Sequence, residues 1–308
     1  MEQQVLQTGT TAAILCPPGV SGEGRCSVGL RITPLLAGAA AAQLRGRERV
    51  AVCYDGTPAG RAAAELFMSS LSLAGGDCLW LGSAAPGPFY HGWSRGECAL
   101  GIFFRQKEGI EAQITLPGGL PLTRRRRAQL NLELLRLWEK TECQPSLRTG
   151  RRLEADPFPA YSEMLSHLLG DRLMGCCCRI EGGPSVLRKL GSAVLCAAGV
   201  RPRGGCVLVL SATGEEASLR LRDGTVLPWE RLVEDLCRTR LARGEEVALP
   251  EGLCAQSGQW PEGSGVMRYR PDGEDRTARS LAMLHPWVRD GLLAGLMWMT
   301  EQRENCRF

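Results

Sequence analysis

Residues 49–60 read RVAVCYDGTPAG, and this stretch decides the fold. The first six residues form a short apolar run of the length of a buried strand. Asp55 to Gly60 then carries the Gly, Pro and Asp residues of a turn. Beyond the turn, apolar side chains recur at helical spacing at Ala63, Leu66, Phe67 and Leu71. A buried strand, a turn and a helix in this order predict a β-α-β unit, in which helices cover a parallel sheet.

The same alternation extends along the first half of the chain. Further strands are expected at 77–81, 99–104 and 109–116, and a helix is expected from Thr33, with Thr33 as its N-cap and Pro34 in the first turn. The sequence therefore predicts an α/β protein. Its expected architecture is three-layer α/β/α sub-domains with mixed, mostly parallel sheets.

The pattern divides into two parts joined by a polar stretch. Residues 1–140 form the expected first α/β/α domain, and residues 161–308 form a shortened second α/β region. Residues 141–160 are polar, basic and contain proline without apolar periodicity, so they are expected to be a linker. The second region carries a hairpin closed by Asp223-Gly224 and ends on a helix expected at 286–301.

Composition limits the classes of function. The chain has 308 residues, 44% hydrophobic and 23% charged, with a net charge of +4. This excess of positive charge is too small to predict a nucleic-acid partner. The first residues lack a signal-peptide pattern, and the apolar stretch 292–299 is too short to span a bilayer. We therefore expect a cytoplasmic protein without a membrane partner.

The chain contains fourteen cysteines and three histidines. Most of the cysteines lie in apolar runs, so reduced, buried thiols are expected. A zinc site would need paired Cys-x-x-Cys or Cys/His spacing, whereas Cys176 to Cys178 are contiguous and their side chains diverge. The sequence predicts no metal site of this kind.

The order of four motifs resembles the α-D-phosphohexomutase family, which comprises phosphoglucomutases, phosphomannomutases and phosphoglucosamine mutases. Gly9-Thr10 with residues 31–34 (RITP) is similar to the opening turn and helix start of the family. Residues 55–60 (DGTPAG) resemble its "GRDTRPSG" turn. Residues 223–227 (DGTVL) resemble its "DExGxxLxGD" hairpin, and residues 289–296 (RDGLLAGL) its "RDGLLAAL" helix start.

The resemblance implies a four-domain α/β protein that moves a phosphoryl group between two hydroxyls of one sugar. Members of the family use a phosphoserine, a divalent metal, a sugar-binding loop and a C-terminal phosphate-binding loop. The metal, usually Mg²⁺, needs clustered carboxylates and neutralises the charge of the transferring group. Each of these parts can be sought in the present sequence.

The phosphoserine loop of the family would follow the strand at 99–104. Residues 101–110 read GIFFRQKEGI, which is shorter than the family loop, and no serine occurs between Ser94 and Ser146. Thr115 lies beyond the loop, in the next expected strand. The sequence therefore predicts no catalytic nucleophile and no catalytic residue.

The metal loop of the family, "DGDADR", aligns with residues 211–216 (SATGEE). The positions of the three ligand aspartates are then Ser211, Thr213 and Glu215, and that of the family arginine is Glu216. Two neutral hydroxyls and one carboxylate lack most of the charge that Mg²⁺ requires. We therefore expect a degenerate metal loop and no cofactor.

The sugar loop of the family, "GEESG", aligns with residues 273–277 (GEDRT), which keep the glycine and Glu274. The sequence offers no counterpart of the C-terminal phosphate-binding domain, so this domain is expected to be absent. Only Glu274 and Asp55 remain as candidate sugar contacts, which disfavours phosphosugar binding.

These observations favour a phosphohexomutase-like pseudoenzyme that has lost catalysis and has a partner-binding or regulatory role. One alternative is an active phosphosugar mutase, an intramolecular phosphotransferase of carbohydrate metabolism. A second alternative is a non-catalytic phosphosugar-binding protein. The discriminating features are the nucleophile, the carboxylate cluster and the cleft residues, of which the sequence retains few.

Two further stretches bear on partners. Arg124 to Arg127 begin an expected helix, where the helix dipole disfavours cations. A solvated surface is the favoured interpretation, and an anion-binding or partner-binding patch is the alternative. The helix expected at 286–301 is apolar nearly all round, which predicts a protein partner or self-association near Trp298.

Overall fold

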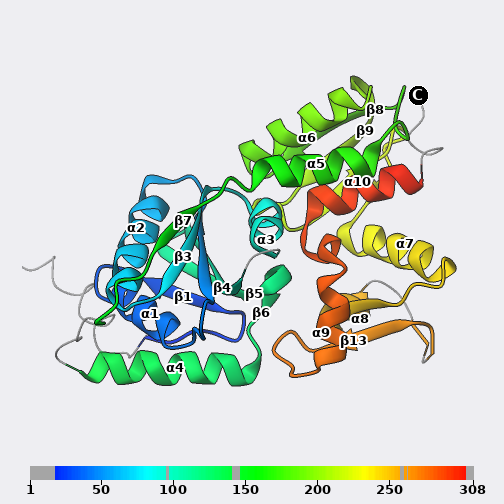
Figure 1. The fold of residues 1–308 in the computed structure, drawn as a ribbon. Coiled ribbons are helices and arrows are strands. Elements are labelled where there is room, and N and C mark those ends of the chain that lie inside the picture. The colour runs from blue at the N-terminus through cyan, green and yellow to red at the C-terminus, as the bar shows by residue number, and fades with distance from the viewer. Residues whose placement is uncertain (1–17, 95–96, 141–145, 257–259, 262, 303–308) are drawn as a thin grey trace, which may run out of the picture.

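The computed structural model describes residues 18–94, 97–140, 146–256, 260–261 and 263–302 (Figure 1). The opening motif at Gly9-Thr10 lies outside these residues. The elements follow in the order β1 (Arg25–Val28), α1 (Ile32–Ala41), β2 (Arg49–Tyr54), α2 (Pro58–Leu73), β3 (Asp77–Ser83), α3 (Pro86–Ser94), β4 (Cys98–Gln106), β5 (Ile110–Leu116), η2 (Pro117–Gly119), β6 (Leu120–Pro121), α4 (Arg124–Glu139), β7 (Arg152–Glu154), α5 (Phe158–Leu169), β8 (Cys177–Gly182), α6 (Ser185–Ala197), β9 (Arg201–Leu210), β10 (Ala217–Arg220), β11 (Val226–Leu227), α7 (Trp229–Ala242), β12 (Val247–Pro250), α8 (Glu251–Gln256), β13 (Val266–Tyr269), α9 (Arg276–Met283), η3 (Pro286–Arg289) and α10 (Gly291–Glu301).

The first sheet has the order β1-β5-β4-β2-β3-β7, and β6 pairs with β5 at its end. Strands β2, β3, β4 and β7 are parallel, and β5 runs antiparallel to β4 and β1. The sheet is therefore mixed and mostly parallel. The prediction of an α/β fold is confirmed.

Alternate residues of β2 point to the two faces of this sheet. Val50 and Val52 belong to the core under α1 and α2, whereas Ala51 and Cys53 belong to the core under α3. Helix α4 packs on the outside of α1, as Figure 1 shows. Helices therefore cover both faces of the sheet. Because β2, β3 and β4 are parallel, their carboxyl ends meet at one edge of it.

The start of α1 differs from the prediction. The helix begins at Ile32 with Arg31 at its N-cap, where no side chain caps the helix. Thr33 lies inside the first turn and is 1% exposed. The prediction of Thr33 as N-cap is wrong because its side chain packs into the core instead of turning back to the helix end.

The segment expected to be a linker contributes to the first sheet. Of its residues, 141–145 lie outside the described residues, and residues 152–154 form β7. This strand pairs in parallel with β3, with Leu153 opposite Leu79. Its three side chains are exposed, as is common for a short edge strand. The sequence does not reveal such a strand, because its exposed side chains show no apolar pattern and it joins the sheet through its backbone.

The second sheet has the order β11-β10-β9-β8, with β8 and β9 parallel. Its apolar residues form one core with α5, α6, α7 and α10. Gly191 of α6 and Gly295 of α10 lie against Ile180 and Leu208, which are paired across β8 and β9. The opposite face of β8 carries an ion pair between the exposed Arg179 and the half-buried Glu181, so the helices lie on one face of this sheet.

The last expected helix is two elements. A 3₁₀ turn, η3, ends at Arg289, and α10 starts at Gly291 after Asp290 takes an extended conformation with φ −142° and ψ 96°. The nine residues from Gly291 to Met299 are all buried. Trp298 is 3% exposed, and its indole nitrogen donates to Asp235 of α7 at 3.0 Å.

This burial corrects the argument for a partner. Helix α10 is covered within its own chain by α5, α7, β9 and β10. The uncovered apolar helix from which a protein partner or self-association was expected is therefore not present, because the chain itself supplies the cover.

The third sheet consists of β12 and β13, which pair in parallel. Helices α8 and α9 pack on it, and its apolar residues contact Leu120 of β6 in a small separate core. The chain thus brings the hairpin end of the first sheet against a part of the protein that follows it by more than a hundred residues (Figure 1).

The sequence predicted buried cysteine thiols and no membrane-spanning segment. Eleven cysteines lie in the described residues, and all but Cys196 are buried. The expectation of reduced, buried thiols fits these positions. Among the described residues, no helix has the length and apolar character needed to cross a bilayer.

Candidate functional site

The loop after β2 is held by Asp55. One carboxylate oxygen, Oδ1, accepts hydrogen bonds from the amide and hydroxyl of Thr57 at 3.0 and 2.6 Å. The other, Oδ2, accepts from the amide of Gln106 at 2.8 Å. Thr57 in turn caps α2 by accepting from the amide of Gly60 at 3.1 Å. Asp55 therefore joins the ends of β2 and β4, and it holds Thr57, the residue that caps α2.

The loop at which the resemblance expects a phosphoserine is a tight turn. Strand β4 ends at Gln106 and β5 begins at Ile110, and the amide of Lys107 donates to the carbonyl of Gly109 at 2.8 Å. Arg105, only 7% exposed, is ion-paired with Glu111 at 2.6 Å. The turn presents no hydroxyl. Thr115 lies in the interior of the sheet, where its hydroxyl donates to Gly101 at 3.4 Å.

The loop of Ser211, Thr213 and Glu215 follows β9, at the carboxyl end of the parallel pair β8 and β9. The amide of Ser211 donates to the carbonyl of Glu216 at 2.9 Å, so the loop closes on itself. The hydroxyls of Ser211 and Thr213 lie 3.5 Å apart. They accept from the amides of Glu216 and Glu215 at 3.2 and 3.4 Å.

Glu215 is engaged from another part of the chain. Its Oε1 accepts a hydrogen bond of 2.9 Å from the hydroxyl of Tyr90 on α3. Burial, together with the negative charge of Glu215, raises the pKa of Tyr90 well above its usual value. Tyr90 therefore stays protonated and acts as a donor to the carboxylate.

This donor set does not fit Mg²⁺. Two of the three positions are neutral hydroxyls that already accept from backbone amides, and the third is a carboxylate held by Tyr90. Within the described part of the chain, no group of three or more His, Cys, Asp or Glu residues is placed to hold a metal ion. No reaction step can be derived through a metal at this loop.

The path of the chain beside Tyr90 requires glycine. Gly118 and Gly119 both have φ of +72°, and a Cβ atom at Gly119 would lie 2.6 Å from the ring of Tyr90. These two residues let η2 pass directly over α3. They therefore position Tyr90 for its contact with Glu215.

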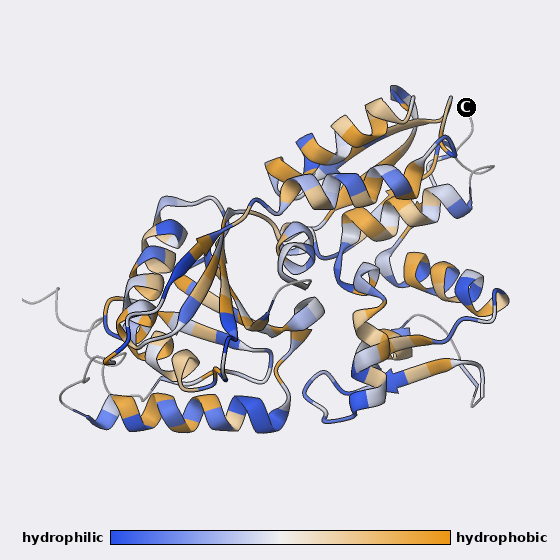
Figure 2. Cartoon of the chain, in the orientation of Figure 1, coloured by the Kyte–Doolittle hydropathy of each residue, from blue (hydrophilic) through white to orange (hydrophobic). Residues whose placement is uncertain are grey.

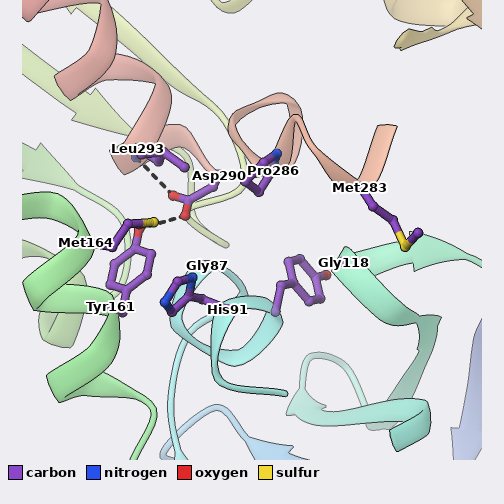
Figure 3. A pocket seen from close by; sticks show the side chains of 10 residues that line it. Gly87, His91, Gly118, Tyr161, Met164, Met283, Pro286, Asp290 and Leu293 are labelled. Atoms are coloured by element: carbon purple, nitrogen blue, oxygen red, sulfur yellow. Dashed lines mark hydrogen bonds between the residues drawn. The ribbon is translucent and has the colours of Figure 1, made fainter. Parts of the chain in front are cut away.

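A cavity of about 60 Å³ lies beside this contact, where α3, α5, η2 and α10 meet (Figure 3). Its polar wall is made by Tyr90 and His91 of α3, Tyr161 of α5 and Asp290 at the start of α10. Met164 and Met283 supply apolar surface. A volume of this size holds only a few water molecules or a ligand of a few atoms.

Asp290 is the buried acid of the cavity. Its Oδ2 accepts from the hydroxyl of Tyr161 at 2.7 Å, and its Oδ1 accepts from the amide of Leu293 at 3.1 Å, as the dashed lines of Figure 3 show. Asp290 thus caps α10 and ties it to α5. Burial raises the pKa of Asp290 from its ordinary value to about 6.

Glu274 lies elsewhere. This exposed residue accepts from the backbone amide of Arg125, in the first turn of α4, at 2.8 Å. That hydrogen bond lowers the pKa of Glu274. The structure therefore brings Ser211, Thr213 and Glu215 together in one loop and places Glu274 against α4.

Three residues of the site were missed by the sequence analysis: Tyr90, Tyr161 and Asp290. Asp290 had a usable signal, since an Asp directly before a glycine and an apolar helix is a typical N-cap. Tyr90 and Tyr161 had none, because their partners lie 125 and 129 residues away in the sequence.

No protein-family model matches the sequence, and no curated protein matches it. Solved structures do match the fold. A phosphoglucomutase/phosphomannomutase family protein from Burkholderia thailandensis is similar with a TM-score of 0.64 and 12% identity, over 90% of this chain and 75% of that one. A protein from Thermus thermophilus assigned as a phosphomannomutase gives 0.67 and 16%, over 92% and 80%.

A third solved structure is the open form of the exocytosis-sensitive phosphoprotein pp63/parafusin, a phosphoglucomutase from Paramecium. It is similar with a TM-score of 0.62 and 14% identity, over 94% of this chain and 72% of that one. At such low identity the likeness concerns the fold, and it extends over nearly the whole chain. The protein therefore has a phosphohexomutase-like fold, the fold of the phosphoglucomutases and phosphomannomutases.

Proposed function

We propose that this phosphohexomutase-like protein is a cytoplasmic pseudoenzyme, which does not transfer phosphoryl groups and has a partner-binding or regulatory role. The observation that carries the proposal is the state of the loop Ser211–Glu216. Its two hydroxyls bond to the loop's own backbone, and its one candidate ligand, Glu215, accepts a hydrogen bond from Tyr90.

The turn between β4 and β5 supports the same conclusion. Phosphoryl transfer depends on a positioned nucleophile and on neutralisation of charge in the transition state. At the expected position of the nucleophile the chain has Arg105 paired with Glu111 and a short turn. A nucleophile and a metal are two independent requirements, and the residues described at these two loops favour neither.

Phosphosugar binding without turnover is the less favoured function. Its two candidate contacts are Asp55 and Glu274. Asp55 already accepts three hydrogen bonds from Thr57 and Gln106. Glu274 accepts from the amide of Arg125. A sugar hydroxyl would have to displace these partners, which are part of the fold.

A coupled mutase assay tests the proposal. Glucose, mannose and glucosamine phosphates are supplied with Mg²⁺ and a bisphosphate activator, and no conversion above the blank is expected. Turnover that copurifies with the protein and disappears in Glu215→Ala would establish the alternative, an active mutase. Calorimetry with the same sugar phosphates separates the binding alternative, for which heat of stoichiometric binding without turnover is the signature.

A further inference from the structure

Helix α4 begins in an unfavourable way. Its first four residues are arginines, at the end of the helix where the dipole disfavours positive charge. The first N–H groups of any helix also lack partners within the helix. Thr123 satisfies one of them by accepting from the amide of Arg126 at 3.2 Å. Figure 2 shows this end of α4 in hydrophilic colours.

Residues 270–275, the loop between β13 and α9, supply hydrogen-bond acceptors and negative charge to this helix end. The amide of Arg124 donates to the carbonyl of Asp272, and that of Arg125 to the carboxylate of Glu274, both at 2.8 Å. The carboxylate of Asp272 also lies 3.6 Å from the guanidinium of Arg124 and 3.5 Å from that of Arg127. Two negative charges thus face the positive helix end.

A buried arginine lies behind this loop. Arg279 of α9 is 8% exposed and donates to the carbonyls of Pro271 and Gly273 at 2.9 and 3.4 Å. The same side chain donates to the carbonyl of Pro121 in β6. One guanidinium therefore fixes the shape of the loop and ties it to the strand that leads into α4.

The contact continues inward to the cavity. Leu120 of β6 packs against Tyr269, Ala278 and other apolar residues of the third sheet and α9. Arg289 donates to the carbonyl of Gly118 at 3.1 Å. Gly118 also lies against Met283, and both residues line the cavity. The outer loop, the buried Arg279, the half-buried Arg289 and the cavity wall form one continuous interface.

We propose that residues 270–275 are a latch, which grips the first turn of α4 and holds the third sheet and α9 closed on the first sheet. The arginine run at 124–127 is the part of the first sheet's domain that the latch grips. Its charge is unfavourable on an isolated helix and is offset by Asp272 and Glu274. The latch is independent of whether the protein is a mutase.

Release of the latch is measured by amide hydrogen exchange of the full chain. In the double variant Asp272→Asn/Glu274→Gln, amide exchange in segments 116–121, 124–128 and 270–276 should accelerate roughly tenfold. The two carboxylates no longer stabilise the first turn of α4, so the loop and the helix end separate more often. Amides of the buried strand β4 should keep the protection of the parent protein. If the double variant exchanges globally, the single variant Glu274→Gln is used, with a smaller acceleration of the same three segments expected.

The control is Glu251→Gln. Glu251 of α8 forms an exposed ion pair with Arg270 at 3.6 Å and belongs to the same part of the chain, but α4 is not its partner in that pair. Exchange in all three segments should be unchanged in this variant. Unchanged exchange in the double variant would overturn the proposal. So would faster exchange confined to 270–276, since a latch must release both sides.

Discussion

The hydroxyl of Tyr90 donates a 2.9 Å hydrogen bond to the carboxylate of Glu215, across 125 residues of sequence. Tyr90 belongs to the helix that covers one face of the first sheet, and Glu215 to the loop after β9 in the second sheet. This bond occupies the one carboxylate among the three candidate ligand positions. It makes the loop at 211–216 part of the contact between the two sheets.

Loss of this bond should destabilise the protein. Tyr90→Phe leaves the carboxylate of Glu215 without its donor, and the free energy of unfolding should fall by about 1–3 kcal/mol. Denaturant unfolding measures the change. Tyr54→Phe is the control, since the ring of Tyr54 stacks on Trp80 of the neighbouring strand β3, and a change within about 0.5 kcal/mol is expected. Equal stability of Tyr90→Phe and the parent would contradict the role given to this bond.

Magnesium should bind weakly at residues 211–216. Two hydroxyls add no charge, so we expect a dissociation constant of about millimolar or weaker, measured by calorimetry. Replacing Ser211 and Thr213 by Asp should tighten binding, because these side chains lie beside each other in one loop. A stoichiometric micromolar site in the parent protein would contradict the expected weak binding. No gain in the double Asp variant would show that this loop does not derive from a metal loop.

Asp290 should make stability depend on pH. Its pKa is raised to about 6 in the folded protein, against about 3.9 in the unfolded chain. The folded state therefore binds the extra proton between these values. The stability that this proton contributes is present below about pH 4 and lost as pH rises through 6, a change of about 3 kcal/mol.

Asp290→Asn tests this dependence, since asparagine also caps helices. The variant should gain about 3 kcal/mol relative to the parent between pH 4 and pH 7, seen in unfolding curves at several pH values. Asp275→Asn, at the exposed N-cap of α9, controls for the loss of a carboxylate at a helix start. If the stability of Asp290→Asn and that of the parent changed with pH in the same way, Asp290 would not be the group responsible for the pH dependence.

Gly87 should not tolerate a side chain. A Cβ atom there would lie 2.4 Å from the carboxylate of Asp290. Gly87→Ala should therefore cost about 1–3 kcal/mol of stability, because α3 or α10 must shift. Gly252, the second residue of α8, has open space around it, so Gly252→Ala should be neutral or slightly stabilising. Thermal unfolding measures the stability of both variants. Equal stability would show that α3 and α10 can move apart without cost, which would contradict the prediction.

Elements with local signals were predictable. The turn after β2 and the hairpin at Asp223-Gly224 follow from the positions of Gly, Pro and Asp, and Gly224 has a positive φ of 90°, which glycine adopts at no steric cost. The end of the chain was harder. A continuous apolar run predicted one helix, whereas Asp290 breaks it into η3 and α10 because its side chain caps the second piece.

The sequence predicted which loop carries the candidate residues, but it did not predict the contacts that these residues make. The alignment placed Ser211, Thr213 and Glu215 in one loop, which the structure has after β9. It could not indicate that Glu215 meets Tyr90 or that Glu274 meets Arg125. Such pairs arise from the docking of distant elements, and a single sequence carries no periodicity or spacing that reports on it. For the same reason the arginines at 124–127 read as a solvated surface.

The position of α10 has a consequence for synthesis. The ribosome completes β8 and β9 long before α10 emerges, and at usual elongation rates the interval is on the order of ten seconds. During that time the side chain of Leu208, against which Gly295 of α10 later packs, lacks this helix of its core. The nascent chain must therefore carry a second sheet whose apolar face is not yet fully covered, and this is the stage at which a chaperone would be needed.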